Sequence, residues 1–423
     1  IPLRENKLHH NVWIKVTLPD TAAGELEFSL AKAGTETNRV KAFIEALPQI
    51  PENEGAATTG PLPASFWGVL SVRGDDDRFT FEAKAGETLV LDAAAKRLGS
   101  KAELVLSLMD AAGRVIASNI DFEGESDPLV VAKIPADGLY TAKLRDLQLG
   151  ASADHWYRLS VGTLPVLGAV FPLSVPAGLE TELQLIGPNL PAGSRVKVKA
   201  GAGGEVAVPV DAARFRARRA FTVRVAAAPE VLEAEDNDRP AQAQVLAAPG
   251  GANGRFQSPG DVDHYRFSAK AGQTWVLETQ AAQLGLPTDT ALELLHPDGR
   301  PVERVLLRAV RDSYLTFRPI DSTGNGGRFW QWEEMDLGQY LYLQGEVVKL
   351  LLAPRGPDST WDFFAIGGKR RNYFDTSATA HALDEPVYIV EPLPPGTKPP
   401  VNGLPAFPVR YRNDDDADRR LGS

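Results

Sequence analysis

The chain has 423 residues, of which 24% are charged and 43% are hydrophobic, a composition typical of globular rather than disordered protein. Its formal net charge of −10 argues against a nucleic-acid partner or an anionic membrane surface. The absence of cysteine excludes disulfides, thiolate metal sites and a cysteine nucleophile. No apolar run reaches the roughly 18 residues of a membrane-spanning helix, so we expect no membrane span.

Short apolar runs separated by 38 glycines and 32 prolines fill the chain, with almost no helical periodicity. This pattern predicts an all-β protein. Residues 1–48 contain expected strands at 12–18, 26–30 and 40–44, too few to close a sandwich. We interpret this segment as part of an immunoglobulin-like (Ig-like) domain or as a small sheet docked on the next domain.

A string of similar sequence occurs twice, at residues 74–93 and 260–279. Each copy starts with an acidic turn, continues as an alternating strand, and passes through Ala-Gly into a second strand. In the second copy these strands are expected around Tyr265–Phe267 and over residues 275–279. The chain is therefore a tandem repeat, and its function depends on what each copy presents.

The repeat divides the chain into alternating segments. Residues 49–164 hold about eight expected strands, which suit a jelly-roll-like sandwich. Residues 165–229 are expected to form an Ig-like module, in which the basic cluster at 214–219 is a solvated strand face. Residues 230–423 form the second copy, interrupted by an aromatic-rich insertion at about 303–412. Asn413 resumes the match to the acidic loop of the first copy, and we expect this domain to be cut at its end.

Acidic residues before the second copy follow a regular spacing. Glu233, Glu235 and Asn237 alternate, so an extended segment would place them on one face. Asp261 and Asp263 are likewise two residues apart at the start of a strand. Calcium binds six to eight oxygens from such groups, and close carboxylates repel one another without a cation. The alternative is a solvated acidic linker and an Asp-rich turn.

The second copy resembles the bacterial pre-peptidase C-terminal (PPC) domain. The resemblance is carried by Glu233–Asp238, Gly260–Phe267, Ala271–Gln273 and Leu292–Arg300, and the first copy shares it. It implies a β-sandwich accessory domain of secreted or cell-surface proteins, often beside peptidases, with no catalytic activity of its own. The alternation with Ig-like modules is similar to large exported proteins of planctomycete-type bacteria.

The resemblance also implies a structural calcium ion that ties the linker to the sandwich. Its ligands would be Glu233, Glu235, Asn237, Asp238 and Asp263, with Asp261 nearby. In the first copy a poorer second site is expected, because Gly55 and Ala56 stand where the second copy has Asp236 and Asn237. The remaining residues of that site match: Glu52, Glu54, Asp75 and Asp77.

The insertion contains many aromatic residues, and three tryptophans are candidates for stacking on a sugar ring or anchoring a partner: Trp330, Trp332 and Trp361. The alternative is that they form the core of the insertion. Ser377, His381 and Asp384 lie close together but lack the Gly-x-Ser-x-Gly turn of a nucleophile, and triads normally come from distant segments.

These observations favour a non-enzymatic binding or spacer region of a larger exported protein, secreted, periplasmic or on the cell surface, with calcium as the cofactor. Its partner would be a protein or a glycan. The alternative is a substrate-binding accessory region of a secreted peptidase or of an enzyme that acts on polysaccharides.

Overall fold

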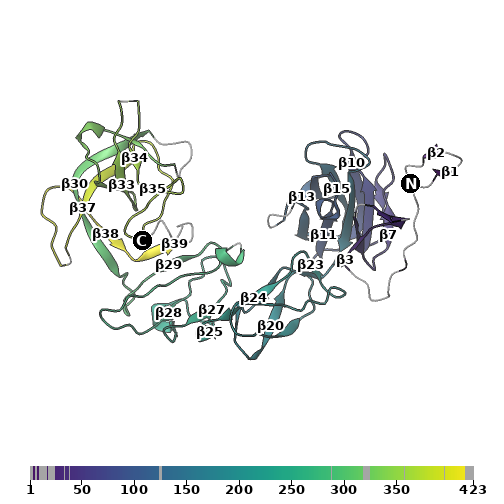
Figure 1. The fold of residues 1–423 in the computed structure, drawn as a ribbon, viewed down its shortest axis with the longest axis horizontal. Helices are drawn as coiled ribbons and strands as arrows, with labels where there is room; N and C mark the ends of the chain where they lie inside the picture. Colours follow the sequence, from purple (N-terminus) through teal and green to yellow (C-terminus); the bar gives the residue numbers. More distant parts are fainter. Residues whose placement is uncertain are drawn as a thin grey trace. The chain divides into compact units, whose positions relative to one another are not determined.

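The computed structural model describes residues 3–4, 7–8, 17, 24–32, 34–37, 39–122, 126–286, 288–317, 324–356, 358–394 and 396–414. Within them there are strands and short 3-10 helices but no α-helix, so the predicted all-β class of tandem β-sandwiches is confirmed (Figure 1). No helix in these ranges is long and apolar enough to cross a membrane. Apart from residue 17, the strand predicted at 12–18 lies outside the described residues.

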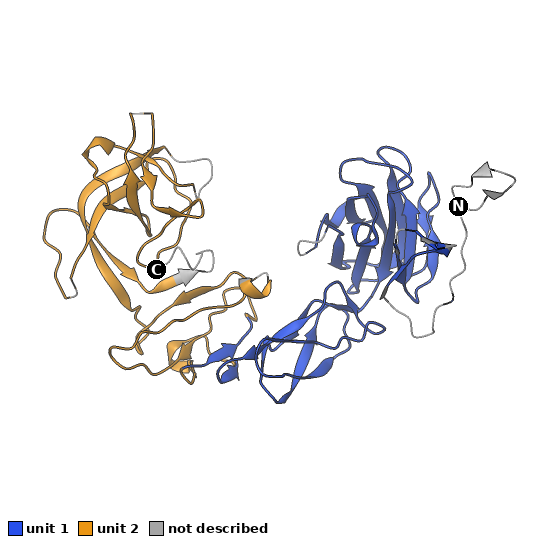
Figure 2. Cartoon of the chain, in the orientation of Figure 1, with its two compact units in different colours: residues 1–233, 249–255 blue, residues 234–248, 256–423 orange. Residues whose placement is uncertain are grey.

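Two compact units make up the chain: residues 1–233 with 249–255, and residues 234–248 with 256–423 (Figure 2). The first unit begins with short strand pairs. They are β1 (Leu3–Arg4) with β2 (Lys7–Leu8), β3 (Gly24–Phe28) with β6 (Val40–Ile44), and β4 (Ala31–Lys32) with β5 (Thr35–Glu36). The division of the sequence into four segments stays a prediction.

The first copy of the repeat forms two five-stranded sheets, ordered β13-β12-β15-β10-β8 and β14-β11-β16-β9-β7. Their strands are β7 (Gln49–Pro51), β8 (Thr58–Thr59), β9 (Ala64–Val69), β10 (Asp76–Ala83), β11 (Thr88–Ala94), β12 (Leu104–Met109), β13 (Val115–Asn119), β14 (Leu129–Lys133), β15 (Gly138–Asp146) and β16 (Trp156–Gly162). Alternate side chains from both sheets meet in one core, which includes Phe66, Phe79 and Leu91. We call this the first sandwich.

Two strands of the first sandwich are buried on both faces. From their second residue onward, every side chain of β11 and β16 is buried. Leu91 and Leu159 point into the core, whereas Asp92 and Arg158 occupy the outward positions. Other segments of the chain must therefore cover the outer face of these two strands.

Residues 165–229, here the middle module, form two three-stranded sheets, β18-β20-β21 and β19-β24-β22, around their own core. The strands are β18 (Ala169–Phe171), β19 (Ser174–Pro176), β20 (Glu180–Ile186), β21 (Arg195–Lys199), β22 (Glu205–Ala207) and β24 (Thr222–Ala226). A separate parallel pair, β17 (Val166–Leu167) with β23 (Arg216–Ala217), lies where the chain enters this module. This pairing fixes the backbone at Arg216 and, just after the strand, at Arg218.

The second copy differs from the first in its strands. Its short strands are β25 (Glu230–Leu232), β26 (Gln244–Val245), β27 (Gly251–Asn253), β28 (Tyr265–Arg266) and β29 (Ala291–Glu293). The strand predicted over residues 275–279 does not form, and Val276 is 82% exposed, whereas its counterpart Val90 is fully buried. In the first sandwich β11 pairs with β14 and β16, which follow the point where the two copies stop matching.

The insertion interrupts one hairpin of the second copy. Leu292 on β29 pairs with Asn413 on β39 (Arg412–Asp414), as Leu106 pairs with Asn119 in the first sandwich. This equivalent register agrees with the predicted return to the repeat at Asn413. Between these strands lies a sheet ordered β31-β30-β37-β32-β33-β34, with β38 also on β30. It consists of β30 (Glu303–Phe317), β31 (Arg328–Phe329), β32 (Tyr340–Leu343), β33 (Glu346–Leu352), β34 (Asp362–Phe363), β37 (Pro386–Pro392) and β38 (Ala406–Arg410), beside the hairpin β35 (Ala365–Ile366) with β36 (Lys369–Arg370).

Candidate metal site

The linker before the second copy is held by backbone pairing. Strand β25 runs parallel to β27, and the N–H of Glu233 donates to the carbonyl of Asn253 at 2.9 Å. One carboxylate oxygen of Glu233 then accepts a hydrogen bond from the N–H of Arg255 at 2.7 Å. Glu233 is thus fixed at its main chain and at one carboxylate oxygen.

Asp263 lies just before β28, which pairs in parallel with β26. The carbonyl of Asn237 accepts a hydrogen bond from the N–H of His264 at 3.0 Å, and the N–H of Gln244 donates to the carbonyl of His264 at 2.9 Å. The segment from Asn237 to Gln244 is therefore fastened beside Asp263.

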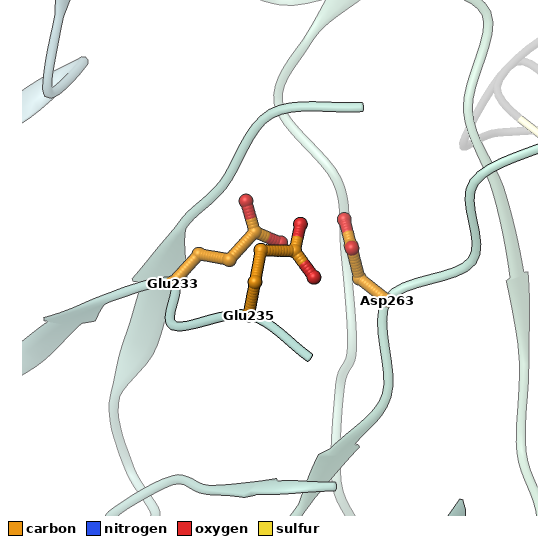
Figure 3. A group of neighbouring side chains, drawn as sticks. All are labelled: Glu233, Glu235 and Asp263. Atoms are coloured by element: carbon orange, nitrogen blue, oxygen red, sulfur yellow. The ribbon is translucent and has the colours of Figure 1, made fainter. Parts of the chain in front are cut away.

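This arrangement brings three carboxylates together. Oxygen atoms of Glu233, Glu235 and Asp263 all lie within 4.8 Å of one another (Figure 3). Glu233 and Asp263 are partly buried, and Glu235 is exposed. The linker thus lies beside the start of the strand, and three of the expected ligands form one group. Three carboxylates at this separation repel one another unless a cation or protons neutralise them.

Asn237 provides a second, independent observation. Its side chain is fully buried, and neither Oδ1 nor Nδ2 has a hydrogen-bond partner among the described residues. A buried amide without partners is costly, because it has lost its hydrogen bonds to water. Since carboxylate and amide oxygens are ligands that calcium prefers, the residues present fit a calcium ion.

The structure does not bring Asp238 and Asp261 into the group. Asp238 is exposed, and a carboxylate oxygen of Asp261 accepts a hydrogen bond from the N–H of Gln257. In the first copy Asp75 accepts the equivalent bond from the N–H of Ser71 at 2.7 Å. The first aspartate of each signature therefore closes its own turn.

The first copy uses a tyrosine between its acidic residues. The hydroxyl of Tyr157 lies 2.6 Å from an oxygen of Asp77 and 3.0 Å from an oxygen of Glu52. Burial raises the pKa of Asp77 to about 8, and the neighbouring Glu52 adds to the rise. A Cβ at Gly68 would lie 2.1 Å from Glu52 and 2.5 Å from the hydroxyl, so only glycine leaves room for this contact.

The other residues expected at the first site lie elsewhere. The second oxygen of Glu52 accepts a hydrogen bond from the N–H of Val69 at 2.8 Å, Asp75 caps its turn, and Glu54 is exposed. Among the described residues these side chains form no group of three within 4.8 Å. Tyr157 was not anticipated from the sequence, because it is 105 residues from Glu52 and carries no local motif.

The tryptophans of the insertion fall into two environments. Trp361 is 2% exposed in the main core of the insertion, and Trp332 packs against the same core. The hypothesis that Trp361 contacts a ligand is therefore wrong. Trp330 is 43% exposed and stacks on Tyr314, with ring centroids 5.6 Å apart and an interplanar angle of 14°.

His381 belongs to a buried ionic cluster. Its Nε2 lies 2.8 Å from Glu346 and its Nδ1 lies 3.2 Å from Glu385. Burial alone would lower the pKa of His381, but hydrogen bonds to both carboxylates outweigh it and raise that pKa. Arg370 donates two hydrogen bonds to Glu346, at 2.5 and 2.8 Å. Nε2 of His381 therefore holds the loop that follows Thr379 to Glu346 on β33, and Nδ1 holds it to Glu385, just before β37.

Comparison with known proteins gives matches to solved structures alone. No family model matches the chain, and no curated protein matches it. The pre-peptidase C-terminal domain of a Bacillus anthracis collagenase is similar at 17% identity, covering 26% of this chain and 98% of that domain, with a TM-score of 0.21. Aeromonas hydrophila PliG, a periplasmic inhibitor of g-type lysozyme, is similar at 17% identity over 25% of this chain and 97% of its own, with a TM-score of 0.19.

A third solved structure matches over most of the chain. It contains the M60 catalytic domain with the CBM51-1 and CBM51-2 domains of Clostridium perfringens ZmpB. The identity is 11%, the match covers 95% of this chain and 43% of that one, and the TM-score is 0.18. We draw no conclusion about function from matches with these scores.

Proposed function

We propose that this chain is a non-catalytic spacer or binding region of an exported protein, in which calcium fastens the linker to the second copy of the repeat. The PPC resemblance of the sequence supports this proposal, as does the all-β architecture. Glu233 and Glu235 from the linker, with Asp263 from the strand start, would hold the ion. Calcium would supply the positive charge that lets the three carboxylates lie together.

The observation that carries the proposal is the convergence of those carboxylates, together with the buried amide of Asn237, two residues along the linker from Glu235, whose side chain has no partners among the described residues. The acidic spacing alone fits a solvated linker equally well. A solvated linker, however, gives no reason for Asn237 to be fully buried with both polar atoms unpaired. Coordination of a cation by Oδ1 gives such a reason for the amide oxygen.

Thermal unfolding with calcium and with a chelator tests the proposal. Calcium at 100 times its dissociation constant stabilises the folded protein by about 2.7 kcal/mol, which raises the melting temperature by a few degrees. The variant Asp263→Asn should lose this rise. Its matched control is Asp77→Asn at the same position of the first copy, which should keep it. Identical melting curves with calcium and with chelator would contradict the proposal.

A second candidate function, glycan binding by the insertion, is favoured by one observation. Trp330 and Tyr314 form an exposed parallel stack, and an aromatic face in this setting can stack on a sugar ring. In this alternative the chain would be the substrate-binding region of a secreted peptidase or of an enzyme that acts on polysaccharides.

A glycan array probed with the full chain distinguishes the two candidates. Binding that is lost in Trp330→Ala and kept in Trp67→Ala supports the glycan function, since Trp67 is an equally exposed tryptophan of the first sandwich. Failure to bind, or equal loss in both variants, favours the spacer.

A further inference from the structure

The outer face of the first sandwich is covered by segments from both sides of it in sequence. The basic cluster at 214–219 was expected to be a solvated strand face, and this is wrong for Arg216 and Arg218. Their side chains are 18% and 7% exposed, and both lie against the buried carboxylate of Asp92 on β11. Arg216 is on β23 in the middle module, and Arg218 follows directly after that strand.

Arg218 makes most of its contacts with the first sandwich. Its guanidinium donates to Asp92 Oδ1 from Nη2 at 2.6 Å and from Nε at 3.1 Å. The same group donates to backbone carbonyls of Ala93, Asp127 and Pro128, at 2.9, 2.5 and 2.8 Å. This planar fork is therefore bonded to one carboxylate and three carbonyls of another module, a geometry that lysine cannot reproduce.

The N-terminal segment closes the same cluster from the other side. Glu45 accepts hydrogen bonds from Arg158 at 2.7 Å and from Ser160 at 2.9 Å, both on β16, and it also pairs with Arg216. The Arg158 guanidinium lies 4.1 Å from the ring centroid of Phe43. Three parts of the chain thus meet in one buried ionic group.

The charges within the cluster complement one another. Burial alone would raise the pKa of Asp92, but Arg97, Arg218 and Arg158 outweigh it and lower that pKa to about 2. Apolar contacts add to the joint: Val90, Leu129, Leu164 and Val166 form a buried cluster with Leu47 and Phe122 packed on it, and Leu129 pairs with Asp92 across β14 and β11. Asn189 of the middle module also donates to the carbonyl of Thr88 at 2.8 Å.

We propose that this cluster is a rigid joint, which makes the N-terminal segment, the first sandwich and the middle module one mechanical body. Independent modules on a string would meet through water and exposed side chains. Here the contact consists of buried, geometrically specific bonds to Asp92 and Glu45. The joint is independent of calcium, because none of its residues belongs to the candidate metal site.

Pulsed electron paramagnetic resonance tests the joint in the full chain. The protein has no cysteine, so spin labels attach at Glu82→Cys in the first sandwich and Lys199→Cys in the middle module, both exposed positions. The unmodified joint should give one narrow distance distribution, unchanged at 1 M salt because buried ion pairs are little screened. Arg216→Met with Arg218→Met should broaden the distribution at least twofold.

Two further variants separate the effect of the joint from a general effect of removing an arginine. Arg195→Met is the matched control, since Arg195 lies in the same module and forms an exposed pair with Glu182; it should leave the distribution narrow. Arg218→Lys keeps the charge and the fold, loses the fork, and should broaden the distribution partly. A broad distribution in the parent protein, or an equally narrow one in the folded double variant, would overturn the proposal.

Discussion

The two copies of the repeat both bring carboxyl groups close together, but the groups that surround these carboxyls differ between the copies. In each copy, a linker glutamate faces the second aspartate of the signature: Glu52 with Asp77, and Glu233 with Asp263. The first copy places the Tyr157 hydroxyl between its pair and raises the pKa of Asp77 to about 8. The second copy adds another carboxylate, Glu235, and a buried asparagine.

The difference shows that the repeated acidic motif alone does not determine what neutralises it. A proton suffices where a hydroxyl lies between two carboxyl groups in a partly buried site. Three carboxylates with an unpaired amide require more positive charge, and we propose calcium. If calcium binds as proposed, the stability of the first copy depends on pH and that of the second on the metal.

The largest expected effect comes from one position that the two copies use differently. Asp92 and Glu278 are repeat counterparts, but Asp92 is buried among arginines and Glu278 is exposed. Asp92→Ala should lower the free energy of unfolding by about 3–5 kcal/mol, because buried arginines lose their shared partner. Glu278→Ala should change it by less than about 0.5 kcal/mol. Chemical denaturation measures both, and equal effects would show that the copies do not differ here.

Removing the tyrosine hydroxyl should have the next largest effect. Tyr157→Phe leaves Glu52 and Asp77 without the group between them, and a buried polar group without its partner costs about 1–3 kcal/mol. The exposed Tyr411→Phe is a suitable control. If Tyr157→Phe unfolds at the same denaturant concentration as the parent protein, the hydroxyl contributes nothing to the free energy of unfolding.

The pH dependence of stability should separate the copies further. The folded-state pKa of Asp77, about 8, lies above its ordinary value of 3.8. Its contribution to stability is therefore complete below about pH 4 and is lost as the pH rises through about 8. The melting temperature of the calcium-free protein should fall between pH 5 and pH 9, and Asp77→Asn should flatten that fall. A fall of the same size in the variant would assign the dependence to other groups.

The smallest expected effect is at Glu235, the exposed residue among the three carboxylates of the candidate metal site. Glu235→Gln should weaken calcium binding roughly threefold, or about 0.7 kcal/mol, because an exposed carboxylate is well solvated without the ion. Glu54→Gln, at the matching position of the first copy, should leave calcium binding unchanged. Isothermal titration calorimetry measures both variants, and a change confined to Glu54→Gln would move the site to the first copy.

The sequence predicted the parts of these sites that depend on local spacing. Alternation by two residues placed Glu233 and Glu235 on one face, and the resemblance to the PPC domain implied that Asp263 lies beside them. It could not predict Tyr157, Arg216 or Arg218, because these contacts join strands about a hundred residues apart and leave no local pattern. The strand expected over residues 275–279 does not form for a related reason, since the strands that pair with β11 in the first copy have no counterpart in the described part of the second.

The pairing of β9 has a consequence for how such an array is assembled. Gln49, where β7 begins, and Ser160, close to the end of β16, both pair with Ser65 on β9. With neighbouring strands about 4.8 Å apart, the chain enters and leaves the first sandwich only about 10 Å apart. The sandwich is thus a side branch of the polypeptide path, and gain or loss of such a copy during evolution would barely change the distance between its neighbours.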